Sequence, residues 1–171
     1  TSYILLSEPD KKGNRYIKPF FFCPKDSIEK RSADDRVPYT EWMEQGYLIA
    51  TPGNVVDYVY FVDKILETYF SHNVERVELD QWNASQVAIE LEEKGVEVSF
   101  FSQQISVISY PTKMFEMLVY KGKLKHDGHP ILRWMLSGCV IHEDANENIK
   151  VHKGQSHASN YRVDGIVGTI M

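Results

Sequence analysis

Two aspartates of this 171-residue chain occupy positions from which a carboxylate can serve a reaction. Asp80 directly follows a strand-like run and precedes a helical segment, and in open α/β sheets functional groups gather just beyond the carboxyl ends of strands. A carboxylate there can hold a metal ion while the strand fixes its position. Asp164 opens the last apolar segment, and the next residue, Gly165, permits a backbone or a ligand to come close. Both aspartates are therefore candidate functional residues.

Both positions also have a structural interpretation. Asp80 or Asn83 can cap the helix that follows, because short polar side chains accept hydrogen bonds from the first N–H groups of a helix. Asp164 can cap its own helix and favour the positive end of the helix dipole. The residues alone leave both interpretations open.

Other kinds of site have less support. The sequence contains no glycine-rich phosphate loop, no serine in a nucleophile-elbow pattern and no cysteine pair at zinc-finger spacing. His126 and His129 lie three residues apart in a polar segment, where histidines are more often solvated than bound to a metal. The sequence therefore excludes an ATP-hydrolysing motor and a zinc finger from this chain.

The composition is that of one globular domain. Apolar residues make up 43% and charged residues 25% of the chain, and no apolar run approaches the roughly 18 residues of a membrane span. Cys23 and Cys139 are too few for a disulfide framework, so a reducing, intracellular setting is expected. Both ends read as cuts, and we expect residues 1–171 to be one domain of a longer protein.

Charge is unevenly distributed along the chain. The net charge of −5 argues against nucleic acid, because phosphate binding is driven by Lys and Arg. However, residues 111–133 carry five basic and two acidic side chains, whereas residues 57–97 carry ten acidic and three basic ones. This asymmetry fits a basic working face opposite an acidic one, and equally two solvated helix faces.

The predicted elements would place the aspartates at the edge of a mixed sheet. Strand-like runs at 1–7 and 16–23 flank a turn and predict an antiparallel hairpin. Strands and helices alternate between residues 47 and 101, which predicts a parallel α/β unit with right-handed crossovers. Helices are expected at 111–120, at 130–137 and from Asp164 onwards. The predicted fold class is α/β, with helices flanking a mixed central sheet.

Three blocks of the sequence resemble the nuclease domain of tailed-bacteriophage large terminase subunits. The first comprises VPYTEW, QGYL and TPGNVVDY within residues 37–58, and the second is LDQWNA at 79–84. The third joins PTK, GKLKH and PILRWM to RVDGIV within residues 111–167. The blocks occur in the family's order and span most of the chain, which makes their combination specific.

The resemblance implies a ribonuclease-H-like fold and an endonuclease that cuts concatemeric viral DNA during genome packaging. Three acidic residues of that family hold two Mg²⁺ or Mn²⁺ ions, and the second and third map onto Asp80 and Asp164. The first belongs to a strand before Thr1, so we expect the first strand to be missing and the fragment to be weakly active or inactive. Asp57 and Asp127 are the substitutes to test.

The resemblance also implies partners and a location. We expect double-stranded DNA as the substrate, a portal protein and a small terminase subunit as partners in the complete motor, and a host-cytoplasmic site at the procapsid, away from membranes. Two alternatives remain open: a non-catalytic module that holds DNA or docks on the portal, and a resolvase-like or transposase-like nuclease. Six basic residues are candidate phosphate contacts because of their charge and position: Lys113, Lys121, Lys123, Lys125, Arg133 and Arg162.

Overall fold

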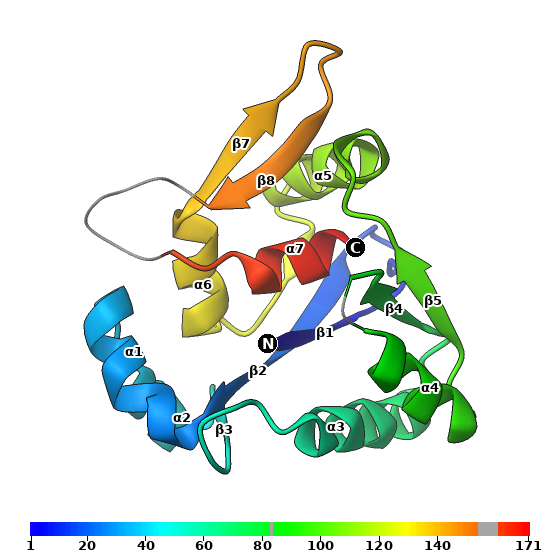
Figure 1. Ribbon diagram of the computed structural model, residues 1–171. Coiled ribbons are helices and arrows are strands. Elements are labelled where there is room, and N and C mark those ends of the chain that lie inside the picture. Colours follow the sequence, from blue (N-terminus) through cyan, green and yellow to red (C-terminus); the bar gives the residue numbers. More distant parts are fainter. Residues whose placement is uncertain (83, 154–160) are drawn as a thin grey trace.

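A mixed sheet forms around the ten-residue strand β2 (Arg15–Pro24). The computed structural model describes residues 1–82, 84–153 and 161–171, so Asn83 lies outside the described residues (Figure 1). β2 pairs antiparallel with β1 (Ser2–Leu6), which confirms the predicted hairpin. It also pairs parallel with β3 (Ile49–Thr51) and, near its start, with β6 (Leu124–Lys125), a short strand that the sequence analysis did not predict.

A second, two-stranded sheet contains β4 (Val77–Asp80) and β5 (Val98–Phe101), which pair in parallel. Helix α3 (Tyr58–Ser71) leads into β4, and α4 (Ser85–Glu93) connects β4 to β5. This is the predicted alternation of strands and helices. It places Asp80 at the carboxyl end of β4, as the sequence indicates.

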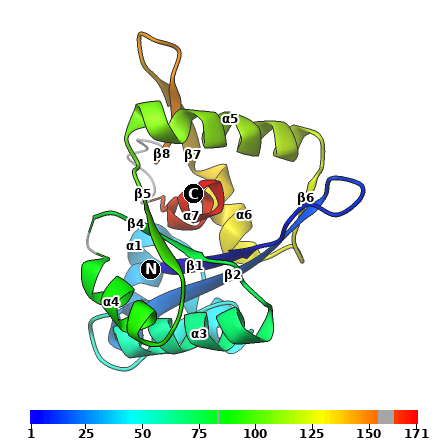
Figure 2. The same cartoon turned by 90° about the vertical axis from the view of Figure 1, so that its right-hand side faces the viewer.

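Helices cover both faces of the β1–β2 hairpin, as Figures 1 and 2 show. Successive side chains of a strand point to opposite faces, and the adjacent residues Phe21 and Phe22 accordingly belong to two different apolar clusters. Phe22 packs in one cluster with the buried α3 residue Ile65. Phe21 packs in the other with Ile131 of α6 (Pro130–Ser137) and Ile166 of α7 (Asp164–Ile170). The hairpin is therefore the central layer of a three-layer arrangement.

The remaining elements surround this frame. A 3-10 turn, η1 (Lys25–Ser27), precedes α1 (Ile28–Asp35) and α2 (Tyr39–Glu44). Strands β7 (Cys139–Glu143) and β8 (Ile149–Lys153) form an antiparallel hairpin, and β8 packs against α5 (Ile105–Tyr120). Within the described part of the chain, no helix combines the length and the apolar character that crossing a bilayer requires.

Helix α5 begins at Ile105, although Pro111 had been predicted to start it. Pro111 lies inside the helix, where it removes one backbone hydrogen bond to the residue four positions earlier. That residue is Val107, whose side chain is exposed. The apolar face continues across the proline, because Ile108 and Thr112 are both buried and the Thr112 hydroxyl donates to the Ile108 carbonyl at 2.8 Å. Burial of this helix face therefore outweighs the tendency of proline to break or kink a helix.

The two sheets are not hydrogen-bonded to each other in the described residues, because no ladder joins β1 to β4. Thr1 and Phe22 exchange backbone hydrogen bonds, so the alternation of an antiparallel ladder turns the N–H and C=O groups of Ser2, Ile4 and Leu6 away from β2. In β4, the backbone N–H groups of Val77 and Gln81 donate to the carbonyls of Glu97 and Phe101 on the β5 side. Glu78 and Asp80 alternate with the bonded residues, so their N–H and C=O groups point away from β5. Both strands therefore present an unpaired edge.

Candidate active site

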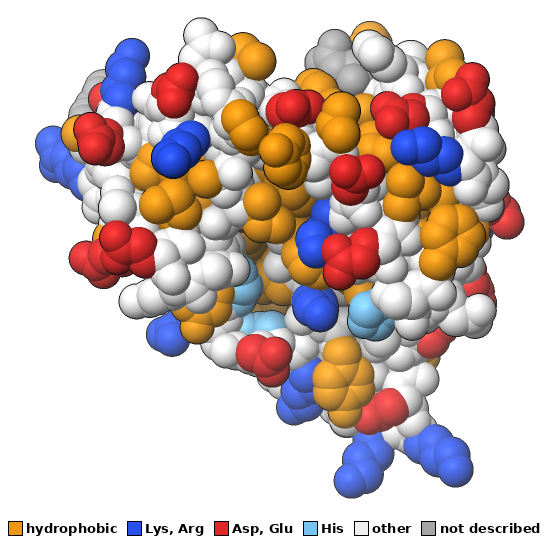
Figure 3. Space-filling model, turned by 90° about the horizontal axis from the view of Figure 1, so that it is seen from below, with side chains coloured by type: hydrophobic (Ala, Val, Ile, Leu, Met, Phe, Trp, Pro, Cys, Tyr) orange, Lys and Arg blue, Asp and Glu red, His pale blue; other side chains and the backbone are white. Residues whose placement is uncertain are grey.

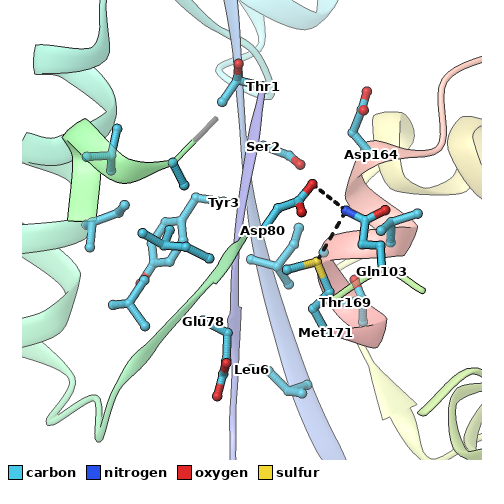
Figure 4. Close-up of a pocket in the computed structure, with 18 of the residues that line it drawn as sticks. Thr1, Ser2, Tyr3, Leu6, Glu78, Asp80, Gln103, Asp164, Thr169 and Met171 are labelled. Atoms are coloured by element: carbon cyan, nitrogen blue, oxygen red, sulfur yellow. Dashed lines mark hydrogen bonds between the residues drawn. The ribbon is translucent and has the colours of Figure 1, made fainter. Parts of the chain in front are cut away.

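A cavity of about 780 Å³ lies between the unpaired edges of β1 and β4. Residues 1–6 line one side and residues 76–80 line the other, while residues of α3, α4, α7 and β8 and the loop residue Gln103 contribute further walls. Figure 4 shows Ser2, Asp80 and Asp164 toward one end of the cavity and Leu6 and Glu78 toward the other. The two candidate aspartates come from elements far apart in the sequence, and the fold brings them to the same end of one cavity.

Asp80 is oriented by hydrogen bonds from the loops that follow the two parallel strands. Its carboxylate accepts from the Gln103 side-chain amide at 2.7 Å and from the Trp82 backbone N–H at 3.2 Å. It does not cap the next helix, since α4 has Ala84 at its N-cap and no side-chain cap bond. No basic side chain of the described residues pairs with Asp80. An ionised carboxylate offers about four acceptor sites, so this one retains acceptor capacity toward the cavity.

Asp164 is the first residue of α7 and is exposed. Helix α7 has no side-chain cap hydrogen bond, although an acid in the first turn still favours the helix dipole. Burial lowers the pKa of the Thr1 amine, and the negative charge of Asp164 acts in the opposite direction on that pKa. This Coulombic effect places the carboxylate near the start of β1.

Gly165 and Gly168 explain how α7 comes close enough to the hairpin to bring Asp164 to the cavity. A Cβ atom at Gly165 would lie 2.7 Å from the Phe21 ring and 3.0 Å from the Met135 sulfur. A Cβ atom at Gly168 would lie 3.3 Å from Ile4. The close approach that the sequence analysis inferred at Gly165 is therefore to the protein's own core.

The donor set suits hard divalent cations but is small. Carboxylate oxygens are the ligands that Mg²⁺ and Mn²⁺ prefer, and Asp80 and Asp164 both supply them to the cavity. No group of three or more His, Cys, Asp or Glu side chains that could hold a metal occurs in the described chain. Asp57 instead caps α3 by accepting from the Val59 N–H at 3.0 Å, and neither Asp57 nor Asp127 lines the cavity. Two carboxylates alone make a partial site.

The cavity also contains polar residues that the sequence analysis did not single out. Gln103, in the loop after β5, positions Asp80. Arg76 and Lys150 are basic residues of the cavity wall, and Arg76 forms an ion pair with Glu78 at 2.8 Å. Lys150 has one signal in the sequence, because it lies between two apolar residues of β8. Ile149 and Val151 are buried, so the Lys150 side chain must face the other way.

The six basic residues predicted to contact phosphate do not line this cavity. Lys113 donates to the Glu147 carbonyl at 2.9 Å, Lys123 donates to the Lys12 carbonyl at 2.7 Å, and Arg133 lines a smaller pocket beside α5. Acidic, basic and apolar side chains are interspersed on the face seen in Figure 3, which therefore shows no continuous basic surface. Phosphate contact by these residues stays a prediction.

Arg162 has a partner inside the protein. Its guanidinium donates to the fully buried Asp35 carboxylate at 2.6 and 3.3 Å, and the Tyr39 hydroxyl donates to the same carboxylate at 2.7 Å. Burial is the largest single influence on the pKa of Arg162 and lowers it, but the hydrogen bonds and charges of Asp35 and Tyr39 together raise that pKa by more, so the guanidinium stays charged. This cluster fixes the segment that leads into α7.

Comparison with known proteins supplies the family context of this site. The family profile described as "Terminase large subunit, endonuclease domain" matches residues 4–171. The large terminase subunit of Enterobacteria phage HK97 is 29% identical over 173 residues, which cover 100% of this chain and 34% of that protein. Protein YmfN of Escherichia coli (strain K12) is 28% identical over 171 residues, which cover 96% of this chain and 37% of that protein.

Solved structures agree with the fold. The crystal structure of the HK97 large terminase superposes with a TM-score of 0.87 at 29% identity, covering 98% of this chain and 35% of that one. The large terminase nuclease of thermophilic phage G20c gives a TM-score of 0.53 at 18% identity, covering 69% of this chain and 61% of that one. The latter likeness shows the fold alone. The chain spans about a third of the length of the relatives HK97 terminase and YmfN.

Proposed function

This chain belongs to the endonuclease-domain family of terminase large subunits, and we propose that its Asp80–Asp164 cavity is a metal-dependent site for cutting double-stranded DNA. The observation that carries the proposal is the convergence of both carboxylates on one end of one cavity. In the complete protein this site would cut concatemeric viral DNA during packaging, in the host cytoplasm at the procapsid. The portal protein and a small terminase subunit would be its partners there.

Mg²⁺ or Mn²⁺, when bound, would activate a water and stabilise the leaving oxygen of the phosphodiester. Asp80 would hold the metal from the end of the strand that borders the cavity. Asp164 would bind one ion from the other side of the cavity end. Gln103 would hold the Asp80 carboxylate in place through its amide.

The gap between β1 and β4 supports the idea that a further strand completes the site. The edge groups of Ser2, Ile4 and Leu6 face those of Glu78 and Asp80 across the cavity, so a strand inserted there would pair on both sides. A segment that enters β1 through a tight turn before Thr1 would run antiparallel to β1. Its carboxyl end would then lie beside Asp80, and an acid at that end would be the third carboxylate.

Plasmid nicking in the presence of Mn²⁺ tests the proposal. We expect the chain to nick plasmid weakly, and Asp80→Ala or Asp164→Ala to abolish that activity. If nicking survives both substitutions unchanged, the two aspartates do not hold the metal. If the chain binds DNA but neither it nor a longer chain ever nicks, the non-catalytic DNA-holding module becomes the better account.

Calorimetry tests the additional strand separately. A chain extended at its amino end by about twenty residues of the natural protein, enough for a strand and its turn, should bind Mn²⁺ more tightly than residues 1–171. An Asp80→Ala version of the extended chain serves as the control. Equal affinity of the short and extended chains would contradict the strand proposal while leaving the roles of Asp80 and Asp164 intact.

A further inference from the structure

We propose that Lys150 is a substrate-contacting residue whose ammonium group binds a backbone phosphate of the DNA held in the cavity. This inference rests on the proposed function and adds to it a residue that lies outside the predicted set of basic contacts. It also gives the β7–β8 hairpin the role of placing a positively charged side chain at the Asp80–Asp164 cavity.

The position of Lys150 follows from the alternation of β8. Ile149 and Val151 are buried, so the side chain between them must leave on the opposite side of the strand. Lys150 reaches the cavity wall from that side, next to Val151 and His152 of the same strand. It is half-buried, in contrast to the exposed Lys113 of α5, so less water competes for its charge.

The hydrogen bond of Lys150 connects it to the aspartate site. Its Nζ atom donates to the backbone carbonyl of Gln103 at 2.8 Å, and the side chain of Gln103 donates to Asp80 at 2.7 Å. A single residue therefore separates the ammonium group from the carboxylate. This places a cation beside the metal ligands without an ion pair between the two.

The charge of Lys150 is not neutralised by an acid of the described residues, because its partner is a neutral carbonyl and no ion pair includes it. Arg76, the other Lys or Arg among the described residues of the cavity wall, is paired with Glu78. An ammonium group has three donors, and the carbonyl uses one of them. Two donors and a full positive charge remain for a phosphate oxygen, beside carboxylates that would otherwise repel it.

A structural role is the competing explanation, in which Lys150 only anchors the loop that carries Gln103. The two roles predict different results for Lys150→Gln. Loss of a phosphate contact weakens DNA binding and reduces its salt dependence, because each neutralised phosphate contributes about 0.9 to the slope of log affinity against log salt. Loss of an anchor would instead disturb Asp80 and weaken the binding of metal.

The experiment compares wild type, Lys150→Gln and Lys150→Arg by fluorescence anisotropy with a short DNA duplex over a salt series, with Ca²⁺ as the divalent ion. Lys94→Gln is the matched control, because Lys94 pairs with Glu90 on the surface of α4, outside the cavity wall. Mn²⁺ affinity is measured for each variant by calorimetry. Nicking rates in Mn²⁺ are measured in parallel.

We expect Lys150→Gln to lower the salt slope by about 0.9 and the nicking rate by about 100-fold, as for removal of one electrostatic contact to a reacting group. Lys150→Arg and Lys94→Gln should keep the slope, and Mn²⁺ affinity should be equal in all four proteins. An unchanged slope in Lys150→Gln, or no duplex binding by wild type even at low salt, overturns the inference. If wild type does not nick but Lys150→Gln still has a reduced salt slope, the proposed catalysis is overturned and the phosphate contact of Lys150 stands.

Discussion

Two carboxylate centres of this molecule are built in opposite ways. Asp35 is fully buried and accepts hydrogen bonds from both Arg162 and Tyr39. Asp80 faces a cavity, has one side-chain amide and one backbone N–H as partners, and has no basic partner among the described residues. A carboxylate whose acceptors are used inside the protein stabilises the fold, whereas one with acceptors facing a cavity is available to a cation.

The comparison predicts its largest effect at the open centre. Asp80→Asn, which keeps the shape but removes the charge, should lower Mn²⁺-dependent nicking by about 1000-fold, equivalent to about 4 kcal/mol of barrier. The free energy of unfolding should change by less than about 0.5 kcal/mol, because no ion pair is lost. Plasmid nicking and urea denaturation measure the two quantities. A large loss of stability with full activity would reverse the roles assigned to the two centres.

The buried centre should behave in the converse manner. Asp35→Asn removes the charge that compensates the Arg162 guanidinium and should destabilise the fold by about 3 kcal/mol, as for other broken buried pairs. Urea denaturation checks this value. Nicking by the fraction that remains folded should stay close to wild type. A stability loss below about 1 kcal/mol would indicate that the pair behaves as a surface ion pair.

Gly165→Ala tests the packing that connects the two centres. The added Cβ atom would lie 2.7 Å from the Phe21 ring, and overpacking of this kind costs about 2 kcal/mol. Because α7 carries Asp164, Mn²⁺ affinity should fall together with stability. A thermal melt and a calorimetric titration measure both effects. Unchanged Mn²⁺ affinity in a destabilised variant would show that Asp164 tolerates the shift of its helix.

The smallest effect is expected from Tyr39→Phe. Burial raises the pKa of the Tyr39 hydroxyl, and its hydrogen bond to Asp35 raises that pKa further, so the group stays a neutral donor. Its removal should cost about 1 kcal/mol in urea denaturation, the net contribution of one hydrogen bond. Arg162 still compensates the Asp35 charge in this variant. A loss as large as that of Asp35→Asn would mean that the tyrosine, rather than the arginine, is the main partner.

The sequence predicted what depends on local order. Asp80 could be recognised because it ends an apolar run before a helix, and Asp164 because it begins one. The α/β class followed from alternating periodicities, and the structure confirms it. Helix α6 was predicted with its observed bounds, since Pro130 starts it and Gly138 follows its end.

What escaped prediction depends on contacts between distant residues. The ion pair of Arg162 with Asp35, 127 positions away in the sequence, was not foreseen, and phosphate contact by Arg162 stays a prediction. Gln103 and Lys150 meet only because β5 and β8 approach the same cavity. Neither residue belongs to a motif, and the alternation of buried residues around Lys150 in β8 does not reveal that Lys150 meets Gln103.

The position of Mn²⁺ in a crystal of the chain soaked in MnCl₂, located by its anomalous scattering, tests whether Asp80 and Asp164 hold a metal ion. We expect a peak in the cavity, with carboxylate oxygens of Asp80 and Asp164 at bonding distance, about 2.1–2.6 Å. The peak should disappear in Asp80→Asn crystals. A Mn²⁺ peak elsewhere, or an Asp80 that stays hydrogen-bonded to Gln103 with no metal beside it, would show that the two aspartates do not form a metal site.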